Sequence, residues 1–287
     1  MSDKTCNAEL ENQLIEQKPE VPGTSKTAGG MYNWVPWTTQ QTFYGVIFTL
    51  VPWIAFNLML IALGGNQALN KPLSFSEDLT AAIVQIVFTF LLEGAFLIAP
   101  YYYARKALNA ETTAEGEVSK GAIFKALGLR GFAVPSALLW IVGMMVVIFG
   151  VDWLYSYAII TWHLNVQTND QIVLQNGQYA PLTTYATLAG ATFIAPFFEE
   201  IYFRGFLFAG LLRELSPAWA ILISSALFAI AHADPGSFIP LFIIGLTLAF
   251  VRWRTGSTWA SMSLHVLNNL LSSLSIILAM HSINLPF

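Results

Sequence analysis

The chain has 287 residues, of which 55% are hydrophobic and 10% are charged, and its formal net charge is −4. Soluble domains carry about 25% charged residues, so the composition excludes an ordinary soluble protein and predicts a polytopic membrane protein. The acidic balance and the lack of a basic run argue against nucleic acid as a partner. A single cysteine, Cys6, excludes a disulfide framework and a cluster of thiolate ligands.

The amino-terminal segment is polar. Residues 1–30 are rich in Pro, Gly, Ser, Thr and Glu and lack the apolar core of a secretory signal. A chain of this composition buries too little apolar surface to offset the entropy of ordering. We therefore expect residues 1–42 to form a disordered cytoplasmic tail.

Seven apolar windows follow this tail, each on the scale of the roughly 20 helical residues that span a bilayer. They are residues 43–63, 79–102, 134–162, 182–212, 218–232, 238–251 and 259–280. We expect helices, because a backbone in lipid must satisfy its own hydrogen bonds and no alternating strand pattern appears. The sequence thus predicts an all-α membrane protein with about seven transmembrane helices.

A charged and mixed segment, residues 104–133, separates the second window from the third. Its part 121–129 is typical of a short amphipathic helix on the membrane surface. We expect residues 43–133 to form two transmembrane helices with this cytoplasmic segment. Residues 134–287 then form a helical bundle that carries the motifs described below.

The distribution of Lys and Arg predicts the orientation. If the amino terminus is cytoplasmic, the cytoplasmic segments hold twelve Lys and Arg residues and the opposite side holds only Lys71. Positive residues concentrate in cytoplasmic loops. We therefore expect an integral multi-pass protein of the cell membrane with its amino terminus in the cytoplasm.

Three short motifs place ionisable groups inside the last four windows. They are Glu199-Glu200-x-x-x-Arg204, Phe228-x-x-x-His232 and His265-x-x-x-Asn269. Residues four apart share one face of a helix, so Glu200 is placed to pair with Arg204. Glu199 points about 100° away and is free for another task. Glu93 and Asp152 are further acids inside predicted spans, and the sequence assigns them no role.

The motifs together make a self-consistent site for amide hydrolysis. A carboxylate in a dry site is tuned by burial and by neighbouring charges, which lets it take a proton from water. Imidazole and amide donors stabilise the oxyanion that forms when water attacks a carbonyl. We expect Glu199 to act as the base, His265 and Asn269 as the donors, and His232 to orient the water inside the helical bundle.

These motifs resemble those of the CAAX protease and bacteriocin-processing (CPBP) family of intramembrane peptidases, which includes type II CAAX prenyl endopeptidases. That family carries Glu-Glu-x-x-x-Arg, Phe-x-x-x-His and His-x-x-x-Asn in this order on separate transmembrane helices. The resemblance covers roughly residues 134–280, preceded by Leu127-Gly128-Leu129 and including Arg254-Thr255-Gly256-Ser257. It implies an intramembrane endopeptidase that cuts a protein or peptide substrate, with or without a prenyl group, at the membrane lipid. It also implies that Glu199 activates water and that His265 and Asn269 form the oxyanion hole.

Two questions stay open. A His-Glu-x-x-His zinc signature is missing. Glu199, His232 and His265 are nevertheless the candidate ligands of a zinc ion, which would make the enzyme a metalloprotease. The preferred glutamate mechanism requires no cofactor. The rival functions are an ion- or proton-coupled membrane transporter, in which the same acids and histidines relay protons, and a catalytically silent membrane scaffold. Replacing Glu199 by Gln separates these three classes.

Overall fold

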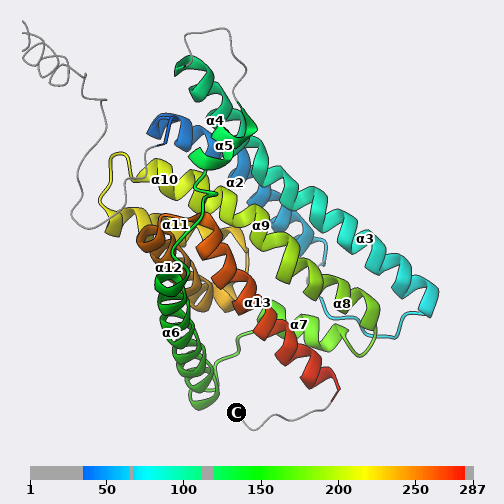
Figure 1. The fold of residues 1–287 in the computed structure, drawn as a ribbon. Helices are drawn as coiled ribbons and strands as arrows, with labels where there is room; N and C mark the ends of the chain where they lie inside the picture. Colours follow the sequence, from blue (N-terminus) through cyan, green and yellow to red (C-terminus); the bar gives the residue numbers. More distant parts are fainter. Residues whose placement is uncertain (1–34, 65–66, 112–118, 282–287) are drawn as a thin grey trace, which may run out of the picture.

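A computed structural model describes residues 35–64, 67–111 and 119–281 (Figure 1). Within these ranges the regular structure is entirely helical, which confirms the predicted all-α class. The predicted tail lies mostly outside the described residues. Its boundary at residue 42 is wrong, however, because Val35 and Trp37 are buried and the Arg213 guanidinium donates hydrogen bonds to both of their carbonyl groups.

All seven predicted windows lie in helical segments. The helices are α2 Thr39–Ala62, α3 Phe75–Gly94, η1 Ala95–Leu97, α4 Ile98–Glu111, α5 Lys120–Ala126, α6 Val134–Thr161, α7 Asn169–Asn176, α8 Pro181–Ala189, η2 Gly190–Ile194, α9 Ala195–Glu200, η3 Ile201–Leu207, α10 Phe208–Leu211, α11 Pro217–Ala231, η4 Pro235–Ser237, α12 Phe238–Thr255 and α13 Thr258–Met280. Five helical segments in the described part are long and apolar enough to cross a membrane, namely Thr39–Ala62, Phe75–Ala110, Val134–Thr161, Pro235–Thr255 and Thr258–Met280. The helix α11 is apolar but shorter. The protein is therefore an integral membrane protein.

Local sequence explains where the first helices begin. The side chains of Thr38 and Ser74 each accept a hydrogen bond from the backbone N–H three residues on, and the side chains of Gln41 and Glu77 accept one from the backbone N–H of Thr38 and Ser74. Such reciprocal caps satisfy backbone N–H groups that have no partner inside the helix. Between helices, the Asp78 carboxylate of α3 accepts hydrogen bonds from the backbone of Leu182 and Thr183, both 2.9 Å long. This contact fixes the start of α8 against the start of α3.

The helices form two groups around α13. On one side α3 runs beside α8 and α9, and on the other α12 packs between α6 and α11 (Figure 1). The central helix α13 contacts α6 and α12 as well as η2 and α9. As a result the three motif-bearing segments, α9 with η3, α11 and α13, meet in the middle of the molecule.

The segment from Pro181 to Leu211 is one helical run with two wide turns of π-helix, η2 and η3. The first wide turn precedes Pro196, which has no N–H group to offer to the preceding turn. The second directly follows Glu199 and Glu200. Wide π turns are frequent at functional sites, because they turn side chains away from the ordinary helical register.

A helix, α5, lies within the segment predicted to hold a surface helix, and the turn that follows it holds α13 in place. Thr258, at the start of α13, donates its side-chain hydroxyl to Leu127 O at 2.8 Å and its backbone N–H to Gly128 O at 2.8 Å. Gly128 has φ +73°, a conformation that strains other residues. A Cβ at Gly128 would also lie 2.5 Å from the Arg252 guanidinium. The turn at residues 127–130 therefore fixes the depth of α13.

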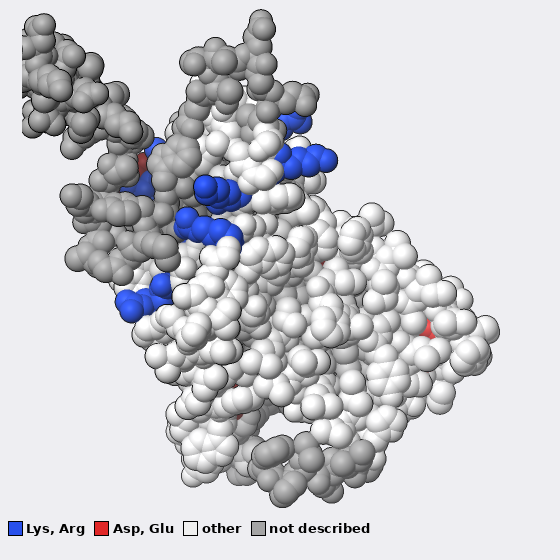
Figure 2. Space-filling view, viewed as in Figure 1, with Lys and Arg blue, Asp and Glu red and all other residues white. Residues whose placement is uncertain are grey.

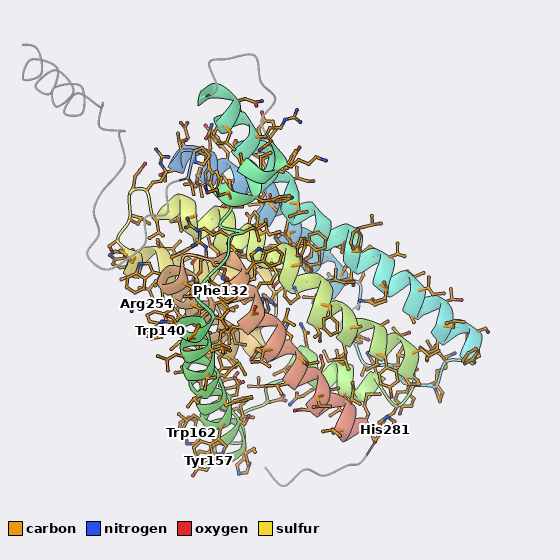
Figure 3. All side chains as sticks on the ribbon, viewed as in Figure 1. Phe132, Trp140, Tyr157, Trp162, Arg254 and His281 are labelled. Atoms are coloured by element: carbon orange, nitrogen blue, oxygen red, sulfur yellow. The ribbon has the colours of Figure 1, made fainter. Side chains whose placement is uncertain are left out.

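Positive side chains gather at one end of the molecule, over α4 and α5 (Figure 2). Exposed members of this group include Arg105, Lys106, Lys120 and Lys125. Arg204 and Arg252, two of the twelve residues in the orientation count, are instead buried in the bundle, so they say nothing about the loops. Aromatic side chains also mark the ends of α6: Tyr157 and Trp162 lie at one end, and Trp140 lies near Arg254 towards the other (Figure 3).

Candidate active site

Glu200 is the anchor of a buried polar cluster at the centre of the bundle. Its side chain is fully buried, and its Oε1 atom lies 2.9 Å from Nη1 of Arg204 and 3.1 Å from Nδ1 of His265. The predicted pairing of Glu200 with Arg204 is confirmed. A carboxylate paired with an arginine accepts hydrogen bonds only. Nδ1 of His265 therefore carries the hydrogen and donates this hydrogen bond to Glu200.

Glu199 lies beside this cluster and faces the other nitrogen of the same imidazole. Its Oε2 atom is 3.8 Å from Nε2 of His265, and the residue is 8% exposed. The two adjacent glutamates thus face different nitrogens of His265, and of the two it is Glu200 that pairs with Arg204, as their 100° separation on a helix predicts. Glu200 thus fixes the orientation of the His265 ring through Nδ1, and Glu199 places a carboxylate oxygen near Nε2 of the same ring.

Phe228 separates the two imidazoles and covers the arginine. Its ring centroid lies 4.6 Å from that of His232 and 5.7 Å from that of His265. The Arg204 guanidinium lies 4.4 Å from the same centroid, where the ring face attracts a cation. Nδ1 of His232 lies 2.7 Å from Phe228 O; since a carbonyl only accepts, Nδ1 donates. Whenever this imidazole is neutral, Nε2 of His232 is its acceptor nitrogen.

Asn269 lies one turn after His265 on α13 and contacts the first wide turn. Its Nδ2 atom donates to Ala191 O at 2.8 Å, and its Oδ1 atom accepts from Asn268 at 3.1 Å. In the π register of η2, where the N–H of Ala195 bonds Gly190 O, Ala191 O would take its hydrogen bond from residue 196. Pro196 has none to give, so the amide of Asn269 supplies it. One N–H of this amide remains for another acceptor.

The donors do not form a metal site as they lie. In the described part of the chain, no group of three or more His, Cys, Asp or Glu side chains is arranged to hold a metal ion. The Nδ1 atoms of both His232 and His265 bond protein oxygens, so the Nε2 atoms are the ring nitrogens that a metal could use. We derive no step through a metal.

A third acid lies on a helix that packs against this segment. Glu93 on α3 is 8% exposed, and α3 contacts α9, which carries Glu199. Its Oε2 atom is buried and has no hydrogen-bond partner among the described residues. The sequence alone assigns Glu93 no role. The feature of the sequence that pointed to it was an acidic residue inside an apolar window.

Comparisons with known proteins point the same way as the motifs. Residues 181–271 match the family model described as "Type II CAAX prenyl endopeptidase Rce1-like", which confirms the resemblance expected from the three motifs. A curated protein of Bacillus subtilis (strain 168), described as "Putative membrane peptidase YdiL", is 33% identical over 101 residues. That match spans 35% of this chain and 40% of the relative. No solved structure matches the chain.

Proposed function

We propose that this protein is an intramembrane endopeptidase of the type II CAAX prenyl endopeptidase kind, in which Glu199 activates water. The observation that carries the proposal is the arrangement of two adjacent buried glutamates on opposite nitrogens of His265. It lies within the segment that matches the endopeptidase family. The substrate is a protein or peptide that reaches the site from the membrane, with or without a prenyl group.

The reaction steps follow from the positions of these side chains. The oxygen of a water molecule bonds to the scissile carbonyl carbon while Glu199 takes one of the water's protons. The C–N bond then breaks, and the proton passes from Glu199 to the leaving nitrogen. The products are a carboxylic acid and an amine, so water supplies every atom that is added.

His265 and Asn269 stabilise the oxyanion. In its imidazolium form His265 donates Nδ1–H to Glu200 and offers Nε2–H to the reacting oxygen. Asn269 offers its second N–H from the same face of α13. The available Nε2 atom of His232 accepts a hydrogen bond from the water and orients it.

The test is reconstituted cleavage of a panel of peptides ending in Cys-a-a-X sequences, each with and without a prenyl group. We expect Glu199→Gln to lower kcat/KM by about 10²- to 10⁴-fold, the usual contribution of a general base. The matched control is Glu214→Gln, a surface glutamate at the end of the same helical run, which should cleave like the wild type. Cleavage by Glu199→Gln at the wild-type rate would overturn the proposal.

A chelator arm decides the metal question. The mechanism above predicts that cleavage continues at an unchanged rate after treatment with a zinc chelator. Loss of cleavage with chelator, and its return on adding zinc, would favour the metalloprotease alternative instead.

A further inference from the structure

The carbonyl group of Ala231, directly before His232, accepts a hydrogen bond from another helix. The last carbonyl groups of a helix have no donor within that helix, and the residue four positions after Ala231 is Pro235, which has no N–H group. The indole of Trp53 on α2 supplies the donor, with its Nε1 atom 2.9 Å from Ala231 O. A side chain of α2 thus fixes the end of α11, where His232 lies.

The turn that follows His232 is strained and is held by contacts of its own. Ala233 has φ +50°, a conformation that few residues other than glycine adopt and that persists only where the surroundings hold it. The Asp234 carboxylate, which is 8% exposed, accepts hydrogen bonds from the backbone N–H groups of Ser237 at 3.2 Å and Asn169 at 3.1 Å. His232 therefore lies between this turn and the carbonyl group that the indole binds.

A second connection joins Trp53 to the site through packed aromatic rings. The Trp53 ring centroid lies 4.8 Å from that of Phe96, and Phe96 lies 5.8 Å from Phe203. Phe203 lies 5.2 Å from Phe228, which in turn lies 4.6 Å from His232. The three phenylalanine side chains are buried. A substitution that keeps an aromatic ring at residue 53 but removes its N–H therefore separates the hydrogen bond from the packing.

We propose that Trp53 is a positioning residue of the candidate active site, which acts through Ala231 O to hold Nε2 of His232 where it orients the attacking water. This inference rests on the proposed function. Trp53 bonds the main chain before His232 and not the reacting atoms. Its helix α2 lies outside residues 181–271, which match the endopeptidase family. The residues that position the site thus extend beyond the part of the chain that the family model covers.

The first test is NMR of the purified protein and needs no substrate. The ring signals of isotope-labelled histidine come from four residues, His163, His232, His265 and His281, and single His→Asn variants assign them. We expect Trp53→Phe, which keeps a ring but removes the N–H, to shift the His232 signals and to leave those of the exposed His281 in place. Trp219→Phe, the same change at an exposed position of α11, should shift neither.

A closer analogue guards against a packing defect. Benzothienylalanine, incorporated in place of Trp53, has the size of tryptophan but carries a sulfur atom instead of the N–H group. It should shift the His232 signals as Trp53→Phe does, because both lose the donor to Ala231 O. His232 signals that stay at their wild-type positions with this analogue would overturn the inference, even when the protein is a peptidase.

The second test uses cleavage. We expect Trp53→Phe to lower kcat on the order of 10-fold, because a displaced catalytic group loses its alignment, with KM changed by less than about 2-fold. Trp219→Phe should cleave like the wild type. In a His232→Asn background, Trp53→Phe should lower kcat by less than about 2-fold further, since residues that act as a unit are not additive.

The two outcomes of this cycle differ clearly. An equal loss of kcat in both backgrounds would mean that Trp53 does not act through His232, and the inference would be wrong. Wild-type protein that cleaves nothing would instead count against the proposed function, and the NMR result would still decide whether Trp53 holds His232 in position.

Discussion

Glu200 and Arg204 illustrate how a charge is kept inside a membrane protein. Both side chains are almost fully buried and lie 2.9 Å apart. The cost of taking two charges out of water is offset only when each has a partner of good geometry. Here the arginine also donates to Gly245 O at 3.3 Å and lies on the ring of Phe228. The pair therefore holds His265 in position, and removing either charge leaves the other buried without its ionic partner.

This dependence can be measured. Arg204→Met leaves Glu200 as a buried charge without its cation, and we expect the free energy of unfolding in detergent to fall by about 3–5 kcal/mol. The double variant Glu200→Gln/Arg204→Met removes both charges and should recover a large part of that loss. Arg105→Met, at an exposed position on α4, serves as the control. The single variant Glu200→Gln completes the cycle, and additive effects of Glu200→Gln and Arg204→Met would show that the pair is not coupled.

At the scale of elements, the wide turn η2 depends on a side chain from another helix. Pro196 removes the hydrogen that Ala191 O would accept, and Asn269 replaces it. One turn further along, the hydroxyl groups of Thr192 and Ser273 lie 2.9 Å apart. Backbone groups freed by a proline inside a membrane are satisfied by neighbouring helices in this way. The contact also sets the position of Asn269 relative to His265.

A double substitution tests this account. We expect Asn269→Ala to lower the free energy of unfolding by about 1–3 kcal/mol, since Ala191 O loses its donor. In a Pro196→Ala background, residue 196 regains an N–H group that reaches Ala191 O, so the same Asn269→Ala substitution should cost less. Thermal or denaturant unfolding in detergent measures both values. An equal cost in the two backgrounds would mean that the proline does not create the need for Asn269.

The sequence predicts features of this fold that are local. The apolar windows mark the helices, and the spacing of four residues pairs Glu200 with Arg204 because that contact lies within one helical run. The contact of His265 with Glu200 joins residues 65 apart in the chain; the motifs predicted a shared site but not that His265 bonds Glu200. The wide turns were not predicted, since Pro196 indicates a break but not its register. Glu93 gave no spacing signal, because the motif residues all lie outside its own helix.

At the scale of the whole molecule, the loops at one end are joined to one another. The backbone N–H of Leu69 donates to Asn176 Oδ1 at 2.7 Å, and that of Leu73 donates to Tyr179 O at 2.9 Å. The loop before α3 and the loop before α8 therefore lie on the same side of the membrane. The exposed Lys106 of α4 lies beyond the far end of α3, where positive side chains gather (Figure 2).

Cysteine labelling can assign these two sides. In a Cys6→Ser background, we expect Lys71→Cys and Gln178→Cys to react with an impermeant thiol reagent from outside the cell. Lys106→Cys and Glu214→Cys should react only after the membrane is opened, because positive segments stay in the cytoplasm. All four positions are exposed, so folding does not limit the reaction. Labelling of Lys71→Cys and Lys106→Cys from the same side would contradict a single crossing by Phe75–Ala110.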